Sequence, residues 1–306
     1  MWGVLHGFAV ILGIIGAGYL ASRFGVVKGE QRLVLNRVAF YVATPALLFS
    51  VLGRSDPAVV VSPVIMVTGL AALVVAGIYV ALSRLWFPRD LASTTLGATS
   101  SGYVNSNNLG LPVAMYILGD AAYVAPLLLL QVVVFSPLIL ALLETTRGNQ
   151  RGAAVALGRA ARNPIIIASA LGLAVALLDL RVPEIVLDPI TMLGDASIPM
   201  VLLSFGISLH GQRALQPGTG RAAVLVATGI KVLVMPVLTW AMCVVFQLSA
   251  HETFVATTIA ALPTAQNVYN YAATYRRAEV QVRDTVVLTT FASLPVIALV
   301  AWLLGA

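Results

Sequence analysis

Charged residues are scarce in this chain. They make up 10% of its 306 residues, hydrophobic residues make up 59%, and the mean hydropathy is +0.96. A soluble domain carries about 25% charged residues, so this composition excludes an ordinary soluble domain. It predicts an all-α integral membrane protein.

The residues that catalysis and metal binding require are also few. The one cysteine, Cys243, excludes an intrachain disulfide and a thiolate metal cluster. The three histidines lie far apart, without the spacing of metal ligands. The chain has neither the signature motifs of zinc proteases and serine hydrolases nor a phosphate-binding loop. We therefore expect no enzyme activity, no cofactor, no metal centre and no direct use of ATP.

Long apolar segments make up most of the sequence. A membrane-spanning helix needs about 20 predominantly apolar residues. Loop charges, prolines and glycines divide the chain into ten such segments, with no room for a soluble domain between them. We predict spans at 3–22, 33–52, 58–86, 93–118, 122–143, 164–180, 185–209, 222–247, 252–275 and 284–304.

The basic residues mark one side of the membrane. Fifteen of the 18 Lys and Arg residues lie in or beside the loops that follow the odd-numbered spans, the longest of which carries the arginines of 147–162. Arg54 and Arg181 lie in the opposite loops, and Lys231 lies inside span 8. The positive-inside rule makes the basic side cytoplasmic and both termini extracytoplasmic, in a multi-pass protein of the cytoplasmic membrane. No basic face carries stacking aromatics, so we expect anionic lipid and not nucleic acid against these loops.

Two of the apolar segments are interrupted by proline and side-chain amides. The interruptions are Asn105–Pro112 in span 4 and Leu262–Tyr271 in span 9. Interrupted spans in corresponding positions of two halves indicate the binding site of a transporter. We assign the helix breaks to Gly110, Pro112 and Pro263, and we expect the two broken helices to cross near the middle of the membrane.

The two halves of the chain repeat. Pro45 and Pro199 interrupt spans 2 and 7 and are 154 positions apart, and Pro112 and Pro263 are 151 apart. Five spans per repeat is an odd number, so the second copy enters the membrane inverted. We predict one transporter domain, 1–306, made of a first five-helix repeat, 1–143, and an inverted second repeat, 164–306.

The amides of the two interruptions are the candidate ligands. They are neutral, so they orient a carboxylate but do not balance its charge. Helix capping, helix–helix hydrogen bonds and substrate contact all remain open for them. The candidate substrate-binding residues are Asn105, Asn108, Gln131, Gln266, Asn267 and Asn270.

Ionisable residues within spans are functional candidates. Lys231 lies in span 8 and Asp195 in span 7, so a coupling role for both, as a pair that exchanges protons, is one hypothesis. A structural pairing of Lys231 with Asp195 or Glu144 is the other. Sodium offers a third route to coupling, with amide oxygens near Asn107, Asn108 and Gln266, and also Asn270, as ligands.

Three stretches of the sequence resemble the auxin efflux carrier family, whose bacterial members include permeases for malate and malonate. The resemblance extends over the whole chain. The matching stretches are Asn105 with Gly110-Leu-Pro112, Leu130-Gln131 with Leu143-Glu144, and Ala261-Leu-Pro263 with Tyr275.

The resemblance implies a bile-acid-symporter-like fold. Spans 1, 2, 6 and 7 would form a scaffold in a homodimer, and the other spans would move against it as an elevator about the crossed spans 4 and 9. Asn105 falls where the family places an amide that contacts the substrate carboxylate. Asn107 and Asn108 replace apolar residues of the family, which favours a smaller and more polar substrate than an indole acid.

The sequence thus predicts a secondary transporter of small organic anions, with H⁺ or Na⁺ as the coupling ion. A sodium-coupled symporter of the bile-acid-symporter type is the alternative, and a channel or membrane sensor belongs to a different class.

Overall fold

The structure is a computed structural model that describes residues 2–27, 29–55, 62–146, 162–211, 215 and 220–305. The arginine-rich segment expected to contact lipid lies mostly outside them, at 147–161. The described residues form helices, turns and one isolated pair of extended residues. Six helices are long and apolar enough to cross a membrane, and two shorter apolar ones accompany them. The prediction of an all-helical integral membrane protein is confirmed.

Several apolar segments are composite helices, in which α-helical and π-helical pieces follow one another, and η5 is a short 3₁₀ helix. In the first half the pieces are α1 (Trp2–Arg23), α2 (Gly29–Val38), η1 (Ala39–Ala43), α3 (Thr44–Leu52), α4 (Pro63–Trp86), α5 (Leu91–Gly102), η3 (Ser106–Gly110), α6 (Leu111–Val113), η4 (Ala114–Leu118), η5 (Ala121–Tyr123), α7 (Ala125–Leu130), η6 (Gln131–Phe135) and α8 (Ser136–Thr145). In the second half they are α10 (Pro164–Leu177), α11 (Glu184–Asp195), α12 (Ser197–Leu209), α13 (Arg221–Gly229), η7 (Ile230–Val234), α14 (Met235–Val245), α15 (Ala250–Ala260), α16 (Gln266–Tyr275) and α17 (Glu279–Leu304).

Proline explains four of the π-helical pieces. Proline has no N–H, and its ring clashes with the carbonyl four residues earlier, so the preceding turn must open. A π turn opens it while the helix continues. In η1, for example, the N–H of Thr44 bonds to the carbonyl of Ala39, five residues back, and Pro45 follows. The prolines that follow η1, η3, η6 and η7 are Pro45, Pro112, Pro137 and Pro236.

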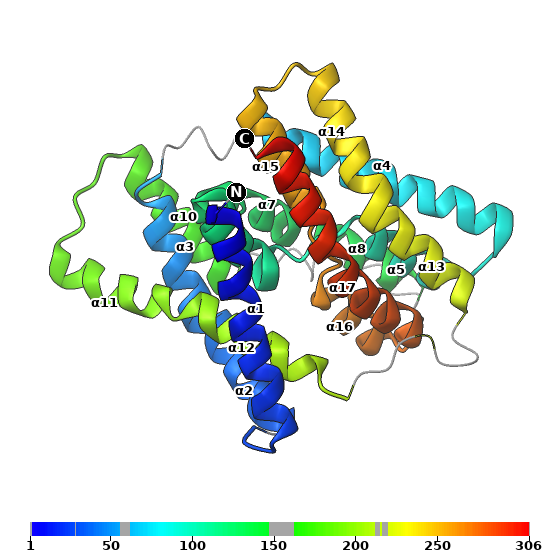
Figure 1. Ribbon diagram of the computed structural model, residues 1–306, viewed down its shortest axis with the longest axis horizontal. Helices are drawn as coiled ribbons and strands as arrows, with labels where there is room; N and C mark the ends of the chain where they lie inside the picture. Colours follow the sequence, from blue (N-terminus) through cyan, green and yellow to red (C-terminus); the bar gives the residue numbers. More distant parts are fainter. Residues whose placement is uncertain are drawn as a thin grey trace.

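The helices form two groups that lie side by side (Figure 1). The first helical group contains α1, α2, η1, α3, α10, α11 and α12. The second helical group contains α4, α5, α8 and α13 to α17, with η7. The segment 106–118, which follows the break in span 4, packs against α1 and α12 and so joins the two groups.

Glycines allow the closest approach between helices in the first group. A Cβ atom at Gly18 of α1 would overlap the carbonyl oxygen of Leu203 in α12. A Cβ atom at Gly206 would overlap the carbonyl oxygen of Ile15 in return. Small residues at such contacts let membrane helices pack tightly, because their backbones can touch.

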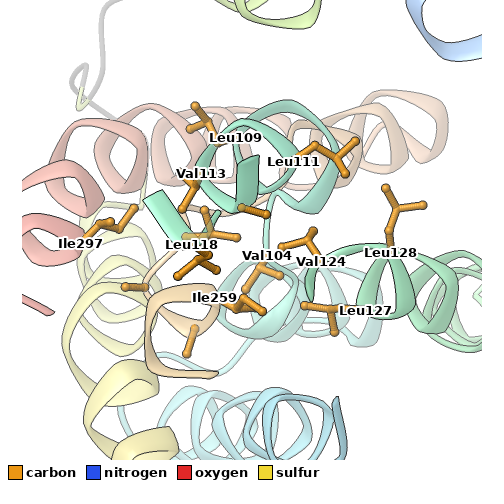
Figure 2. Close-up of a cluster of buried hydrophobic side chains, with 14 of the residues drawn as sticks. Val104, Leu109, Leu111, Val113, Leu118, Val124, Leu127, Leu128, Ile259 and Ile297 are labelled. Carbon is orange, nitrogen blue, oxygen red and sulfur yellow. The ribbon is translucent and has the colours of Figure 1, made fainter. Parts of the chain in front are cut away.

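An apolar core surrounds the break in span 4. Figure 2 shows that side chains from the broken segment, from α7 and its start, and from α15 gather there. Val104, Leu109 and Leu111 are each at most 2% exposed, and Ile259 is 1% exposed. This core excludes water from one side of the break, so polar groups on the other side must be satisfied by protein or by ligand.

Candidate functional site

The two breaks meet in the structure, and backbone hydrogen bonds between them stabilise their non-helical conformation. The N–H of Asn105 donates to the carbonyl of Pro263 at 2.8 Å, and the N–H of Ala265 donates to the carbonyl of Tyr103 at 3.0 Å. Val104 and Thr264 thereby form an antiparallel bridge. Each break thus supplies the backbone partners that the other has lost from its helix, as non-helical backbone inside a membrane requires.

Four helix ends converge on this bridge. The helices α5 and α15 end at Gly102 and Ala260, and new helical segments begin at Ser106 and Gln266. The first residues of a helix have N–H groups without helical partners and carry partial positive charge. Two such N-terminal ends therefore face the crossing and favour an anion there.

Gly110 and Pro112 were expected to break the helix of span 4, but the structure places both of them within helix. Gly110 ends the π-helical segment η3, and Pro112 is the second residue of α6, inside a helix that continues to Leu118. The π turn before Pro112 makes room for the proline ring, so the helix continues through this position. The extended residues are Tyr103 to Asn105, whereas Pro263 does lie within the second break.

Asn105 both caps a helix and presents a free donor. It is 3% exposed, and its Oδ1 accepts the N–H of Asn108 at 3.1 Å, as an N-cap residue does. Its Nδ2 finds no hydrogen-bond partner among the described residues. A buried polar group without a protein partner calls for an explanation, and at Asn105 a ligand that accepts a hydrogen bond would supply one.

Gln131 fixes the backbone of the first break. It is 3% exposed, donates from Nε2 to the carbonyl of Val104 at 3.0 Å, and accepts the hydroxyl of Ser106 at 2.6 Å. The Nε2 and Oε1 atoms of Gln131 thus bond to the residues before and after Asn105 in the chain. The structure gives Gln131 a positioning contact beside the site.

A chain of amides connects the two breaks. Asn107 donates to Asn108 at 3.0 Å, and Asn108 donates to Gln266 at 3.4 Å. The Oδ1 atom of Asn107 has no hydrogen-bond partner among the described residues. Asn267 and Asn270 lie on α16 and are exposed to a cavity beside the crossing.

Two cavities with shared lining residues lie at the crossing. A small chamber of about 20 Å³ is lined by Asn105, Gln131 and residues of both breaks. A larger cavity of about 390 Å³ shares Phe40, Val132 and Asn267 with it. The larger cavity lies between the two helical groups, on the side that the charge pattern predicts to be cytoplasmic. The chamber at Asn105 therefore lies next to the larger cavity on that side.

The larger cavity contains a basic residue that the sequence pattern does not single out. Arg37 of α2 lines it, together with Asn36 and with Asn163 at the start of α10. Among the described residues that line this cavity, Arg37 is the only charged one. The charge pattern assigns Arg37 to a loop. Its position inside the predicted span 33–52 was the one signal in the sequence that it could line a cavity.

Lys231 and Asp195 do not pair. Lys231 is fully buried, and its Nζ donates to the carbonyl of Ala260 at 2.8 Å and to the sulfur of Met235 at 3.0 Å. Asp195 ends α11 in the other helical group and lines a separate cavity of about 250 Å³ with Arg54. The expected contact fails because spans 7 and 8, although consecutive, belong to different groups.

The position of Lys231 has a clear electrostatic reason. Ala260 is the last residue of α15, and a helix C-terminus carries partial negative charge. The Nζ atom of Lys231 thus donates to a carbonyl at the end of α15, beside the second break. A coupling role for Lys231 or Asp195 stays a prediction.

Two further residues that carry the resemblance also touch. The hydroxyl of Tyr275, at the end of α16, donates to Oε1 of Glu144 in α8 at 2.6 Å. This contact ties the second broken helix to span 5. Across the described residues, no three His, Cys, Asp or Glu side chains come together as a metal site would require.

Comparison with known proteins agrees with this architecture. The family model described as "Membrane transport protein" matches residues 4–301. The chain belongs to this family. It is therefore a multi-pass membrane transporter of the family to which the auxin efflux carriers belong, and not an enzyme.

Relatives in other organisms carry transporter names. An uncharacterized transporter of Methanocaldococcus jannaschii is 23% identical over 304 residues, which cover 96% of this chain and 97% of the relative. A protein of Rhizobium meliloti named "Putative malonate transporter" is 27% identical over 292 residues, covering 92% of this chain and 89% of the relative. An uncharacterized transporter of Methanothermobacter thermautotrophicus is 28% identical over 237 residues, or 74% of each chain.

Proposed function

We propose that this protein is a secondary transporter that moves small organic anions, carboxylates in particular, across the cytoplasmic membrane. The observation that carries the proposal is the buried, unpartnered Nδ2 of Asn105, which lies beside two helix N-termini. A buried donor without a partner costs about 1–3 kcal/mol, and a carboxylate oxygen would satisfy it. The relative named for malonate supports the same class of substrate.

Alternating access by an elevator movement fits the packing. Six long helices, two shorter apolar helices and the two broken helices support ten spans. Thr44 and Ser197, from the proline-interrupted spans 2 and 7, have hydroxyls 2.9 Å apart, which supports an inverted 5+5 repeat. The first helical group would be the scaffold, and the second would carry the crossing. Dimer formation stays a prediction.

The two cavities support an inward-facing state. The cavity of about 390 Å³ adjoins the chamber at Asn105, whereas the cavity of about 250 Å³ near Arg54 shares no lining residue with that chamber. The crossing would thus be open to the cytoplasm and closed to the outside. Movement of the second helical group would reverse this access.

Two substitutions of Asn105 test the proposal, because they separate capping from ligand binding. Asn105→Asp keeps an oxygen that caps Asn108 but replaces the free donor with a negative charge, and Asn105→Ala removes both. We expect both purified variants to lose binding of malonate, measured by calorimetry, with Asn105→Asp retaining the melting temperature of the wild type. Normal affinity in Asn105→Asp would reject Asn105 as the ligand, and absence of carboxylate binding to the wild type would reject the proposed substrate class.

A sodium-coupled symporter is the second candidate. The unpartnered oxygen of Asn107, next to Asn108 and Gln266, favours it because sodium binds oxygen donors. Uptake of malonate into proteoliposomes with and without sodium decides between the two. Binding without any uptake would instead indicate a sensor.

A further inference from the structure

Arg37 is an arginine without a partner in the wall of the cavity that leads to the crossing. It forms no hydrogen bond or ion pair with another described residue, although Asn36, Asn163 and Asn270 line the same cavity. The wall contains no acidic residue among those described. Arg37 is exposed, and it lines a cavity between the two helical groups whose wall also carries several amides.

The geometry of α2 and η1 relates Arg37 to the chamber at Asn105. Phe40, three residues after Arg37, lines both the larger cavity and the chamber. Three residues of helix advance by about 4.5 Å, so the arginine lies about one turn from the shared wall. Residues three apart also lie on the same face of a helix. Arg37 and Asn105 therefore line two neighbouring cavities that share Phe40 in their walls.

The two cavities have different chemistry. At the crossing, amides and helix N-termini orient an anion without a formal charge of their own. In the larger cavity, a guanidinium can grip a carboxylate with two parallel hydrogen bonds and offset its charge. Neutral donors alone leave a second negative charge uncompensated in a membrane interior, where this is costly.

We propose that Arg37 holds the second carboxylate of the substrate, so that the transporter selects short dicarboxylates over monocarboxylates. This inference rests on the proposed function, because it assumes that the first carboxylate binds at Asn105. It adds a specificity-determining residue on the first helical group, while Asn267 and Asn270 lie on the second and Asn105 lies at the start of the segment that joins the two groups. A bound dicarboxylate would therefore bridge the two groups.

The test compares malonate with monomethyl malonate, which has the same carbon skeleton but one charge fewer. Dissociation constants are measured by calorimetry on the purified full chain, at a pH where both malonate carboxylates are ionised. For the wild type we expect malonate to bind at least tenfold more tightly than the half-ester. In Arg37→Gln we expect malonate affinity to fall about ten- to hundredfold, to that of the half-ester, while half-ester binding changes less than threefold. Arg37→Lys should recover part of the preference, because lysine keeps the charge without the bidentate geometry.

Arg84→Gln is the matched control. Arg84 lies on the same predicted side of the membrane but lines a different groove of about 320 Å³ between α4, α5 and α8, so its removal should leave both affinities unchanged. An equal loss for malonate and half-ester in Arg37→Gln would overturn the inference and leave Arg37 a structural residue. Equal wild-type affinities for the two ligands would overturn it without any variant, so the test survives a variant that fails to fold. Binding of neither ligand to the wild type would instead contradict the proposed function.

Discussion

Replacing Gln131 by leucine tests whether this residue shapes the site or merely joins two helices. Leucine keeps much of the volume but removes the donor to Val104 and the acceptor for Ser106. A neutral hydrogen bond contributes about 0.5–1.5 kcal/mol net, so the two together contribute about 1–3 kcal/mol. The hydroxyl of Ser106 already lies 3.4 Å from the carbonyl of Val104, so it can turn toward that oxygen and recover part of the loss.

The expected effect on binding follows from the place of these contacts. Val104 and Ser106 flank Asn105, so loosening them lowers the fraction of molecules in which Asn105 is correctly placed. A loss of 1–3 kcal/mol in that equilibrium weakens apparent affinity by up to about 5- to 150-fold. We expect Gln131→Leu to bind malonate at least fivefold more weakly, by calorimetry, and to melt at a slightly lower temperature than the wild type.

Gln281 provides the control within the same chain. It is 2% exposed and donates to the hydroxyl of Tyr79 at 2.8 Å, and it lines neither cavity at the crossing. Gln281→Leu should lower the melting temperature while leaving malonate affinity within about twofold of the wild type, since its one lost bond is remote from the site. If the two variants lose stability alike and both retain affinity, Gln131 is only a helix–helix contact and the reasoning fails.

Two further predictions concern packing and charge. Gly18→Leu should sharply reduce the yield of folded protein or its melting temperature, because the side chain would overlap the backbone of Leu203. Gly13→Leu on the same helix should be tolerated, because a Cβ atom at Gly13 meets nothing within 4 Å. Size-exclusion profiles of the two variants check this. Lys231→Met should lower the melting temperature by about 3–8 °C through loss of the bond to Ala260, and leave the shape of the pH profile of malonate uptake unchanged. A flattened pH profile in that variant would make Lys231 part of proton coupling instead.

The sequence predicted the position of individual apolar helices where the signals for them are local. Apolar length and loop charge placed the third span at 58–86, and α4 runs from Pro63 to Trp86. The same signals placed span 10 at 284–304, and α17 ends at Leu304 but begins earlier, at Glu279. The helix begins before the apolar segment because polar residues also form helix, and hydropathy does not report those turns.

The sequence located the broken helices but not the break in span 4. Proline and asparagine at 105–112 signalled a departure from regular helix, yet the departure there is a π turn, which keeps the helix intact. The extended residues are Tyr103 to Asn105, and what holds them is the backbone of Pro263 and Ala265, about 160 positions away in the chain. No local pattern reports a partner so distant, so only the folded arrangement could identify the break.

The residues of the site divide in the same way. Asn105 and Gln131 stood out because amides are unusual in apolar spans. Arg37 did not stand out, because arginines at the cytoplasmic ends of spans are also common for reasons of membrane topology. Its role depends on which helix faces it, and that is set by packing between the two helical groups.

The distribution of charge around the crossing bears on how an anion is released as well as bound. A fixed cation at the crossing itself would hold a carboxylate equally in every state, because it would travel with the ligand. Here the side-chain amides that line the two cavities at the crossing are neutral, and the guanidinium of Arg37 lies on the first helical group. A relative movement of the two groups would therefore separate the substrate from the charge that attracted it. Affinity would fall on the side where Arg37 is left behind, and release would follow from the same movement that exposes the site.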